Sequence, residues 1–231
     1  MKKLSVCVTT YMRFDLTIKS FEQVIDDDRI YQILLLDDCS KDGSFEKLAE
    51  RFENSNKVKV VQQILNRGMQ INKSDAVRLS PTNWCILFDS DNVISKEYID
   101  KIFELPAWDD DTIYAPSRAL PTFIYDEFAG QTITKANVSG YVGKNFFGAM
   151  INTCNYFLNR DFYIKSFKYN PLVKETDTAN HFYNHLKNNG KFYVVPDLEY
   201  SHLVHENSGF MQNVHYNMAS AMDIEKQLMQ L

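Results

Sequence analysis

The sequence predicts an α/β fold in which a mostly parallel sheet is covered by helices on both faces. Three observations lead to this prediction. Residues 1–105 alternate four apolar runs with amphipathic segments. The apolar runs are short and rich in Val, Ile and Leu, as buried parallel strands are. Polar residues cluster at or just after the end of each run, and ligands bind at this edge of such sheets.

Each element of the first half follows from residue spacing and type. Apolar, β-branched runs predict strands in residues 4–10, 31–38, 57–63 and 84–89. Apolar residues at helical spacing predict helices in residues 15–26, in 45–53, in a segment that ends near Pro81, and in 96–105 after a Ser95 cap. Strand and helix therefore alternate, which favours parallel neighbours joined by crossover helices.

The pattern changes after Pro106. Residues 106–160 are rich in Phe, Tyr, Gly, Asn and Thr with weak periodicity, and we expect loops, short strands and a pocket wall there. A helix is predicted in residues 178–190, where Gly190 ends it, followed by a strand and loop in 191–205 and a helix in 213–231. One compact unit with two subdomains, residues 1–105 and 106–231, is the expected organisation.

Composition excludes several classes of protein. The chain has 231 residues and a formal charge of -5, without a run of Lys and Arg, which argues against nucleic-acid binding. Its four cysteines are scattered without CxxC spacing, so we expect free thiols in a reducing compartment and a cytoplasmic protein. We expect no signal peptide and no transmembrane segment, since no apolar run approaches the roughly 20 residues required. Peripheral contact with a membrane remains open.

Two aspartates directly follow the apolar run of "WCILFDSDN", residues 84–92. Residues i and i+2 of an extended segment point the same way, so Asp89 and Asp91 would repel each other unless a cation compensates them. Oxygen ligands of this kind suit Mg2+ or Mn2+. The alternative is an Asp-rich turn that caps the next helix.

A second acidic pair, Asp37 and Asp38, ends the second apolar run. One carboxylate at that position can accept hydrogen bonds from the base or ribose of a ligand. Because "DCSKDG" is also typical of a turn, a structural role for the pair stays open.

The polar blocks, taken in order, resemble the successive motifs of family 2 glycosyltransferases, which have the GT-A fold. The blocks are "VCVTTYMR" (6–13), "ILLLDDCSKDGS" (33–44), "NRGMQINKS" (66–74), "ILFDSDN" (86–92), "NRD" (159–161), "ETD" (175–177) and "VPDLEYSH" (195–202). The match spans residues 4 to about 205, and its specificity lies in the order and spacing of all the blocks together.

The resemblance implies a metal-dependent, inverting glycosyltransferase that moves a single sugar from a nucleotide-sugar donor, with a UDP-sugar favoured. A glycan, a lipid-linked molecule or a protein is the implied acceptor. Residues 1–105 would bind the donor and 106–231 the acceptor. The implied donor contacts are Thr9, Thr10, Tyr11, Arg13, Asp38, Asn66, Gly68, Lys73, Asp89 and Ser90. The implied ligands of a Mn2+ or Mg2+ ion are Asp91 and His202, with His205 as the alternative to His202.

Inverting transfer also needs a base for the proton of the acceptor hydroxyl. The resemblance implies Asp177 for this role, with Glu175 as the alternative. The alternative is a purely structural role, in which "ETD" is a charged helix start that complements the helix dipole. His181 and His185 are four residues apart on the same predicted helix, but without a third ligand we interpret them as surface or packing residues.

The chain departs from the family pattern at three positions. Thr9 replaces the usual Pro, Met12 the usual Asn, and Lys73 the usual Arg, which differs from Lys in binding phosphate. Because of these departures, the resemblance does not identify which nucleotide sugar is the donor. The Q-x-x-R-W signature of processive synthases is absent, which implies distributive transfer. Two other hypotheses remain: a nucleotidyltransferase of related fold, and a catalytically inactive nucleotide- or glycan-binding module.

Overall fold

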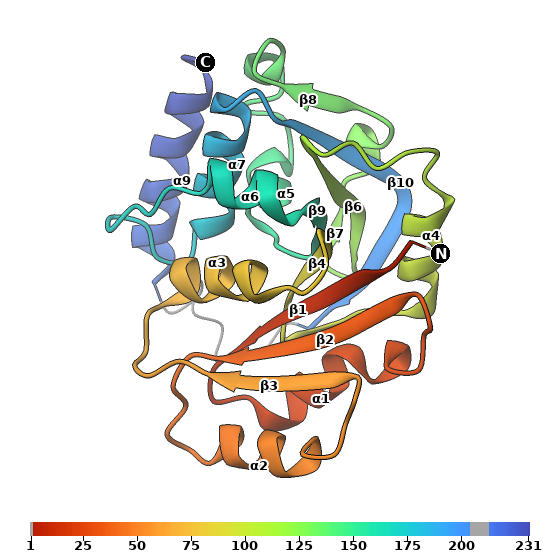
Figure 1. Cartoon of the computed structure of the whole chain (residues 1–231). Coiled ribbons are helices and arrows are strands. Elements are labelled where there is room, and N and C mark those ends of the chain that lie inside the picture. Colours follow the sequence, from red (N-terminus) through yellow and green to blue (C-terminus); the bar gives the residue numbers. More distant parts are fainter. Residues whose placement is uncertain (1, 204–212) are drawn as a thin grey trace.

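The computed structural model describes residues 2–203 and 213–231. Within these residues a ten-stranded sheet has the order β3-β2-β1-β4-β9-β6-β10-β5, while β7 pairs with β6 and β8 with β10 (Figure 1). The strands β3, β2, β1 and β4 are mutually parallel, β9 is antiparallel to β4, and β6 and β10 are parallel to each other. The mostly parallel sheet predicted for the first half is confirmed, and the sheet as a whole is mixed.

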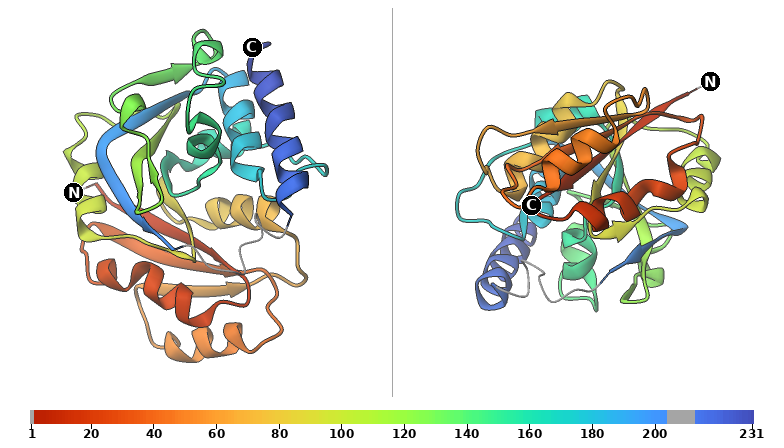
Figure 2. Two further views of the ribbon diagram at one scale, coloured as in Figure 1. Left: turned by 180° about the vertical axis from the view of Figure 1, so that it is seen from behind. Right: turned by 90° about the horizontal axis from the view of Figure 1, so that it is seen from below.

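The elements of the first half lie where the sequence predicts them. The strands are β1 (Leu4–Thr10), β2 (Ile30–Asp37), β3 (Val58–Gln62) and β4 (Trp84–Asp89). The helices are α1 (Phe14–Phe21), α2 (Ser44–Arg51), α3 (Met69–Leu79) and α4 (Lys96–Glu104), with a 3-10 turn at Glu22–Val24. Ser95 caps α4 as predicted, accepting a hydrogen bond from the Tyr98 N–H. Helix α3 covers one face of the sheet, and α1 and α2 cover the other (Figures 1 and 2).

The second half contains more regular structure than its composition indicates. A two-residue strand, β5 (Asn92–Val93), precedes α4 in the first half. The strands of the second half are β6 (Thr112–Leu120), β7 (Phe123–Ile124), β8 (Thr132–Thr134), β9 (Tyr156–Asn159) and β10 (Lys191–His202). Its helices are α5 (Phe147–Asn152), α6 (Arg160–Ser166), α7 (Asp177–Lys187) and α9 (Val214–Leu228), with 3-10 turns at Asp126–Phe128 and Val138–Gly140. None of the helices in the described part of the chain combines the length and the apolar character needed to cross a membrane.

The expectation of only loops and short strands in residues 106–160 is wrong for β6. This strand has nine residues and lies inside the sheet between β9 and β10. Pro116 and Arg118 interrupt its apolar pattern, which is why periodicity does not reveal it. Pro116 is tolerated because its partner Val195 lies at a register shift in β10 (Val195/Glu199), where the regular ladder is interrupted.

Aromatic packing joins the two halves. The Phe157 ring of β9 lies 5.0 Å from the Trp84 ring of β4 and 4.7 Å from the Trp108 ring, measured between centroids. The Tyr114 ring of β6 lies 5.7 Å from the same Phe157 ring. Since β4 also pairs with β9, the sheet and its core run continuously past residue 105. The division into subdomains at that position stays a prediction.

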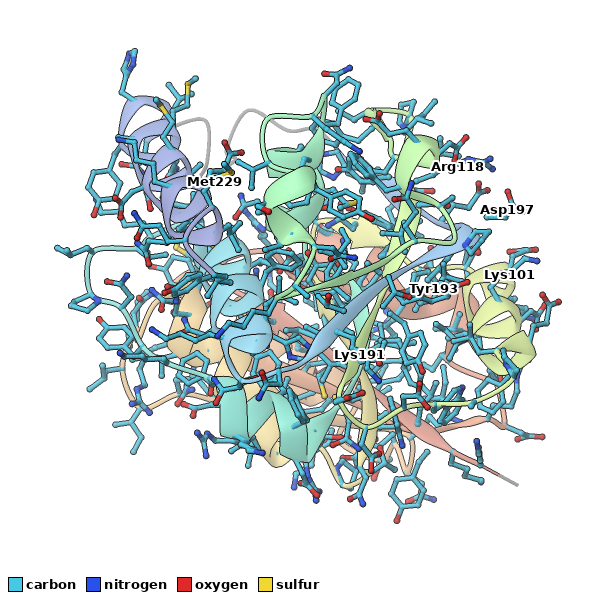
Figure 3. The ribbon with its side chains drawn as sticks, turned by 90° about the horizontal axis from the view of Figure 1, so that it is seen from above. Lys101, Arg118, Lys191, Tyr193, Asp197 and Met229 are labelled. Atoms are coloured by element: carbon cyan, nitrogen blue, oxygen red, sulfur yellow. The ribbon has the colours of Figure 1, made fainter. Side chains whose placement is uncertain are left out.

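The long strand β10 pairs with β6 along most of its length and ends beside β5, which follows β4. At its register shift Asp197 has φ 56°, and its carboxylate lies 3.2 Å from Arg118 (Figure 3). Further along, Ser201 and His202 pair with Val93 and Asn92 of β5. The strand therefore delivers His202 beside the residues that follow β4.

Helix α7 is fixed at its C-terminal end by a buried histidine. The His185 Nε2 lies 3.1 Å from the Asp111 carbonyl oxygen and 2.9 Å from that of Lys191, so the ring N–H donates to backbone oxygens of two neighbouring strand ends. A Cβ on Gly190 would lie 2.4 Å from this ring, so glycine is required there. Burial lowers the pKa of His185 to about 4, and the ring is therefore neutral at pH 7. The interpretation of His185 as a packing residue is confirmed.

The neutral His185 should make stability depend on pH. The folded pKa of about 4 lies below the usual 6.5, so the unfolded chain binds the proton more readily. The neutral His185 ring therefore contributes to the free energy of unfolding above pH 6.5. This contribution, up to about 3 kcal/mol, is lost as the pH falls towards 4. We expect His185→Gln to show a correspondingly smaller fall in unfolding free energy between pH 7 and pH 4.5, measured with urea. Equal falls in both proteins would contradict this assignment.

Candidate active site

Three of the polar blocks meet at the carboxyl ends of β1, β2 and β4. The backbone N–H of Asp38 donates to the Thr10 carbonyl at 2.9 Å, and the N–H of Ser90 donates to the Thr9 carbonyl at 3.3 Å. The ends of the three strands are thus tied together by backbone hydrogen bonds. This is the edge at which open parallel sheets bind ligands.

The two aspartates after β2 have different partners. Asp37 is fully buried and accepts hydrogen bonds from the Ser40 N–H and the Gln62 side chain, so it shapes the turn. The Asp38 carboxylate accepts from the N–H groups of Arg67, at 2.8 Å, and Gly68, at 2.9 Å. Burial raises the pKa of Asp38, and these two donors limit the rise. Asp38 therefore holds the third polar block against the sheet edge.

Gly68 has φ 78° at the point where this block enters α3. A residue with a Cβ would be strained in this conformation. Asn66, two residues earlier, and Tyr11, after β1, are exposed beside the same edge. Thr10 is buried, and its Oγ1 forms a hydrogen bond with Thr17 of α1 at 2.6 Å.

A buried lysine connects the two halves of the site. The Lys73 Nζ of α3 lies 3.2 Å from an Asp89 carboxylate oxygen of β4 and 3.2 Å from an Asp177 carboxylate oxygen of α7. It also lies 3.5 Å from the Thr178 hydroxyl. The side chains of Lys73 and Asp177 are each only 6% exposed. The cation therefore belongs to a largely buried cluster of charges in which Asp89 is the more exposed member, a position that the family resemblance alone does not imply.

The charges of this cluster depend on one another. Burial disfavours the charged form of Lys73, but Asp177 and Asp89 outweigh that effect, and the pKa of the lysine is raised well above 10.5. Burial also raises the pKa of Asp89, and the Lys73 cation opposes the rise. A neutral side chain at position 73 would leave two carboxylates facing each other without compensation.

The second aspartate of "DSD" pairs with another basic residue. The Arg13 Nη1 lies 2.7 Å from Asp91 Oδ2, and both side chains are partly exposed. The Asn92 side-chain amide lies 3.4 Å from Asp91 Oδ1, and Asn92 Oδ1 lies 3.0 Å from the Nδ1 of His202. Arg13, Asp91, Asn92 and His202 thus form one polar chain along the edge. His205 lies outside the described residues.

The donor set fits a cation that is shared with a ligand. Among residues 2–203 and 213–231, no three side chains of His, Cys, Asp or Glu are gathered so that they could hold a metal ion. The Asp91 carboxylate is accessible at the sheet edge. Mg2+ is commonly bound by one or two carboxylates and completed by substrate phosphates and water. The residues therefore suit an ion bound jointly with a diphosphate, and Asp91 pairs with Arg13 in this structure.

Asn155 is a site residue that sequence reasoning missed. Its side-chain oxygen accepts from the Asp89 N–H at 2.9 Å, and its carbonyl accepts from the Tyr98 hydroxyl at 2.6 Å. The residue has φ 77°, a conformation in which Asn is more common than most residues. It fixes the turn after β4. The sequence does not single out Asn155, because the residue follows a segment without clear helix or strand periodicity.

The two candidate bases face different neighbours. Asp177, the first residue of α7, contacts Lys73 and through it the Asp89 carboxylate. The Glu175 carboxylate instead accepts from the Asn213 side chain at 3.1 Å, next to the start of α9. The geometry therefore favours Asp177 as the carboxylate that belongs to the site.

His181 follows Asp177 by one helical turn and is buried. Its ring lies 4.0 Å from the Tyr163 ring, and it lines a small cavity together with Lys73 and Asp177. Neither ring nitrogen has a hydrogen-bond partner among the described residues. Burial lowers the pKa of His181 well below its usual value, so the ring is neutral. This confirms the interpretation of His181 as a packing residue.

Replacing Lys73 should be costly. With Lys73→Met we expect the unfolding free energy at pH 7 to fall by about 3 kcal/mol or more, because a buried ion pair loses one partner. The raised pKa means that the contribution of the lysine is complete at neutral pH and is lost only as the pH rises beyond 10.5. The control is Lys101→Met. The exposed ion pair of Lys101 with Glu104 should contribute little to the unfolding free energy (Lys101 is labelled in Figure 3). Equal urea unfolding of both variants would refute the role of the cluster.

Comparisons with known proteins agree with this geometry. A family model described as glycosyl transferase family 2 matches residues 5–167. Residues 1–349 of S. aureus TarS in complex with UDP align with TM-score 0.67 and 16% identity over 98% of this chain and 65% of that chain. The complex of TarS with UDP-GlcNAc gives TM-score 0.70 and 16% identity over 98% and 70% of the two chains.

The mannosyltransferase PcManGT from Pyrobaculum calidifontis, in complex with GDP-Man and Mn2+, aligns with TM-score 0.70 and 12% identity over 98% of this chain and 69% of that chain. The present chain thus spans about two thirds of the length of these structures. No curated protein sequence matches it. The structural similarity establishes the GT-A fold, and the family model covers most of the chain. The chain therefore belongs to glycosyl transferase family 2.

Proposed function

We propose that the chain is an inverting glycosyltransferase that moves a single sugar from a nucleotide-sugar donor to an acceptor hydroxyl, with Asp177 as the base. One observation carries the proposal: the Lys73 ammonium group contacts the carboxylates of both Asp177 and Asp89, each at 3.2 Å. A carboxylate of the second half is thereby kept beside the acidic edge of the first half. Sugar transfer requires the base, which acts on the acceptor, to lie close to the groups that bind the donor.

The donor would bind across the ends of β1, β2 and β4. Its base and ribose would lie among the residues of the first three blocks and the start of "DSD", namely Thr9, Thr10, Tyr11, Arg13, Asp38, Asn66, Gly68, Lys73, Asp89 and Ser90. Lys73 would act from beneath the site, because its ammonium group is already held by two carboxylates. TarS binds UDP and UDP-GlcNAc, which supports a UDP-sugar as the first donor to test.

Asp91 and His202 would hold a Mn2+ or Mg2+ ion at the donor diphosphate. Such an ion neutralises charge on the leaving nucleoside diphosphate. Arg13 contacts Asp91 Oδ2 and is placed to contribute positive charge to the same group. The polar chain from Arg13 to His202 would thus lie beside the diphosphate, where Arg13 and the metal ion would supply the positive charge.

Sugar transfer would occur as a single displacement at the anomeric carbon. The acceptor oxygen attacks the anomeric carbon while the bond from that carbon to the diphosphate oxygen breaks. Asp177 takes the proton of the acceptor hydroxyl, and Lys73 holds its carboxylate in place. Attack from the face opposite to the leaving group inverts the anomeric configuration. A glycan, a lipid-linked molecule or a protein would supply the hydroxyl.

The cysteines support a cytoplasmic location. Cys7, Cys39, Cys85 and Cys154 are all free and buried. Free thiols are typical of proteins in a reducing compartment.

Nucleotide binding gives the first test. We expect UDP with Mn2+ to raise the melting temperature, because a ligand that binds only the folded state stabilises it. GDP, CDP and dTDP serve as comparisons. Asp91→Ala should remove the part of the shift that depends on Mn2+, whereas Asp28→Ala, which changes an exposed aspartate of another D-x-D triplet, should retain it. The absence of a shift with every nucleotide would favour a binding module for glycans, or another ligand, over the proposed enzyme.

The base gives the second test. Asp177→Asn should lower turnover by about 10²-fold to 10⁴-fold, since it removes general base catalysis, and should leave donor binding within a few-fold. Glu175→Gln is the matched control and should retain turnover. Normal turnover in the Asp177→Asn protein would exclude this base, and loss of turnover only with Glu175→Gln would transfer the role to Glu175.

A further inference from the structure

Exposed apolar side chains gather on one side of the molecule, in two loops. The first is the β3–α3 loop together with the first residue of α3, residues 63–69, and the second is the α6–α7 loop, residues 167–176. Their exposed apolar residues are Ile64, Leu65, Met69, Tyr169 and Leu172. Ile64 is 97% exposed and Leu172 is 74% exposed. Single exposed apolar residues need no explanation, but a cluster of this kind indicates an interaction surface. We call these two loops the apolar edge.

The two loops are fixed to each other. The Gln70 side chain, at the start of α3, donates to the carbonyls of Asn170 and Val173 at 2.9 and 2.8 Å. In return the Gln70 side-chain oxygen accepts from the Asn170 N–H at 3.0 Å. In Figures 1 and 2 both loops lie on the same side of the molecule as α9 in every view. The apolar edge is therefore one surface.

The backbone at the tip of the second loop is already satisfied. The Leu172 N–H donates to the Asn170 side chain at 3.0 Å, and the Leu172 carbonyl accepts from the Tyr216 hydroxyl of α9. The side chain of Leu172 can thus leave water without burying an unpaired peptide group, which is the main cost of placing a loop in an apolar medium. Tyr216 itself is partly exposed beside the loop and extends the surface onto α9.

The charge of the apolar edge differs from that of the chain. The chain has 30 acidic and 25 basic residues. The two segments of the apolar edge nevertheless contain only one acidic residue, Glu175, and three basic residues, namely Arg67, Lys168 and Lys174. All three basic residues are exposed. Apolar tips surrounded by basic side chains suit an anionic lipid surface, which attracts Lys and Arg and accepts apolar groups at its boundary.

We propose that the apolar edge docks on the surface of an anionic lipid bilayer. Apolar side chains at the loop tips would enter the interface, and the lysines would contact the lipid headgroups. A second copy of the chain explains the basic residues less well, because like charges would face each other across a symmetric contact. The docking itself does not depend on the proposed function.

The position of this surface also narrows the acceptor, a step that does rest on the proposed function. Gln70, which holds the second loop, lies on α3 one turn before Lys73. The second loop leads directly into Asp177 at the start of α7. A bilayer on the apolar edge would therefore lie beside the proposed base. The acceptor class that fits this arrangement is a lipid-linked molecule.

Vesicle flotation of the full chain tests the proposal. We expect binding to vesicles of phosphatidylcholine with phosphatidylglycerol, weaker binding to phosphatidylcholine alone, and a decrease with salt. The double variant Ile64→Ser/Leu172→Ser should bind roughly tenfold more weakly or worse, and Lys168→Gln/Lys174→Gln should lose most of the preference for anionic vesicles. The control is Tyr31→Ser/Ile124→Ser, which changes two exposed apolar residues outside the apolar edge, on β2 and β7, with exposures of 53% and 52%, and it should bind as the wild type does.

Several outcomes would overturn the proposal. They are no binding of the wild type to anionic vesicles, equal binding of both serine pairs, and a dimer in solution that only Ile64→Ser/Leu172→Ser dissociates. Unchanged melting temperatures of the variants would show that they fold. Vesicle binding requires neither donor nor acceptor, so binding without sugar transfer would contradict the proposed function and leave the docking surface intact.

Discussion

The buried ammonium group of Lys73 is the interaction on which the arrangement of the site depends. It lies between carboxylates that come from β4 and α7, and Lys73 itself is on α3. Three elements from both halves of the chain therefore meet at one charge. A buried ion pair contributes little net stability, but removing one partner is strongly destabilising, because the other charges are left without compensation. The cluster thus acts as a constraint that fixes the position of Asp177 relative to Asp89.

A second cation, that of Arg13, performs a related role nearer to solvent. It pairs with Asp91 at 2.7 Å, and both groups are partly accessible. The two aspartates of "DSD" thus differ in character: Asp89 is compensated by the buried Lys73, and Asp91 by the partly exposed side chain of Arg13. Only the second arrangement leaves room for a ligand cation or a diphosphate to take over the compensation without opening the core.

Local patterns predicted the first half of the fold well, because its strands are short runs rich in apolar and β-branched residues and its helices have one apolar face. They failed for β6, in which Pro116 and Arg118 interrupt the pattern and long-range pairing with β9 and β10 decides the structure. At the site, the polar blocks could be predicted from their positions after the strands. The partners of Lys73 could not, because the sequence does not reveal that α3 and the first turn of α7, more than a hundred residues away, face each other.

The same limit applies to Asn155, whose side chain holds the turn after β4 from 66 residues away. It applies also to the apolar edge, whose two loops are joined through Gln70. This connection has a mechanical consequence. The loop that leads into Asp177 is held by the helix that carries Lys73, so the position of the base is set at two points, by the ion pair and by the Gln70 hydrogen bonds. A contact on the outer side of that loop would therefore act on a segment that is already fixed, and would orient the whole site relative to the contacting surface without displacing the base.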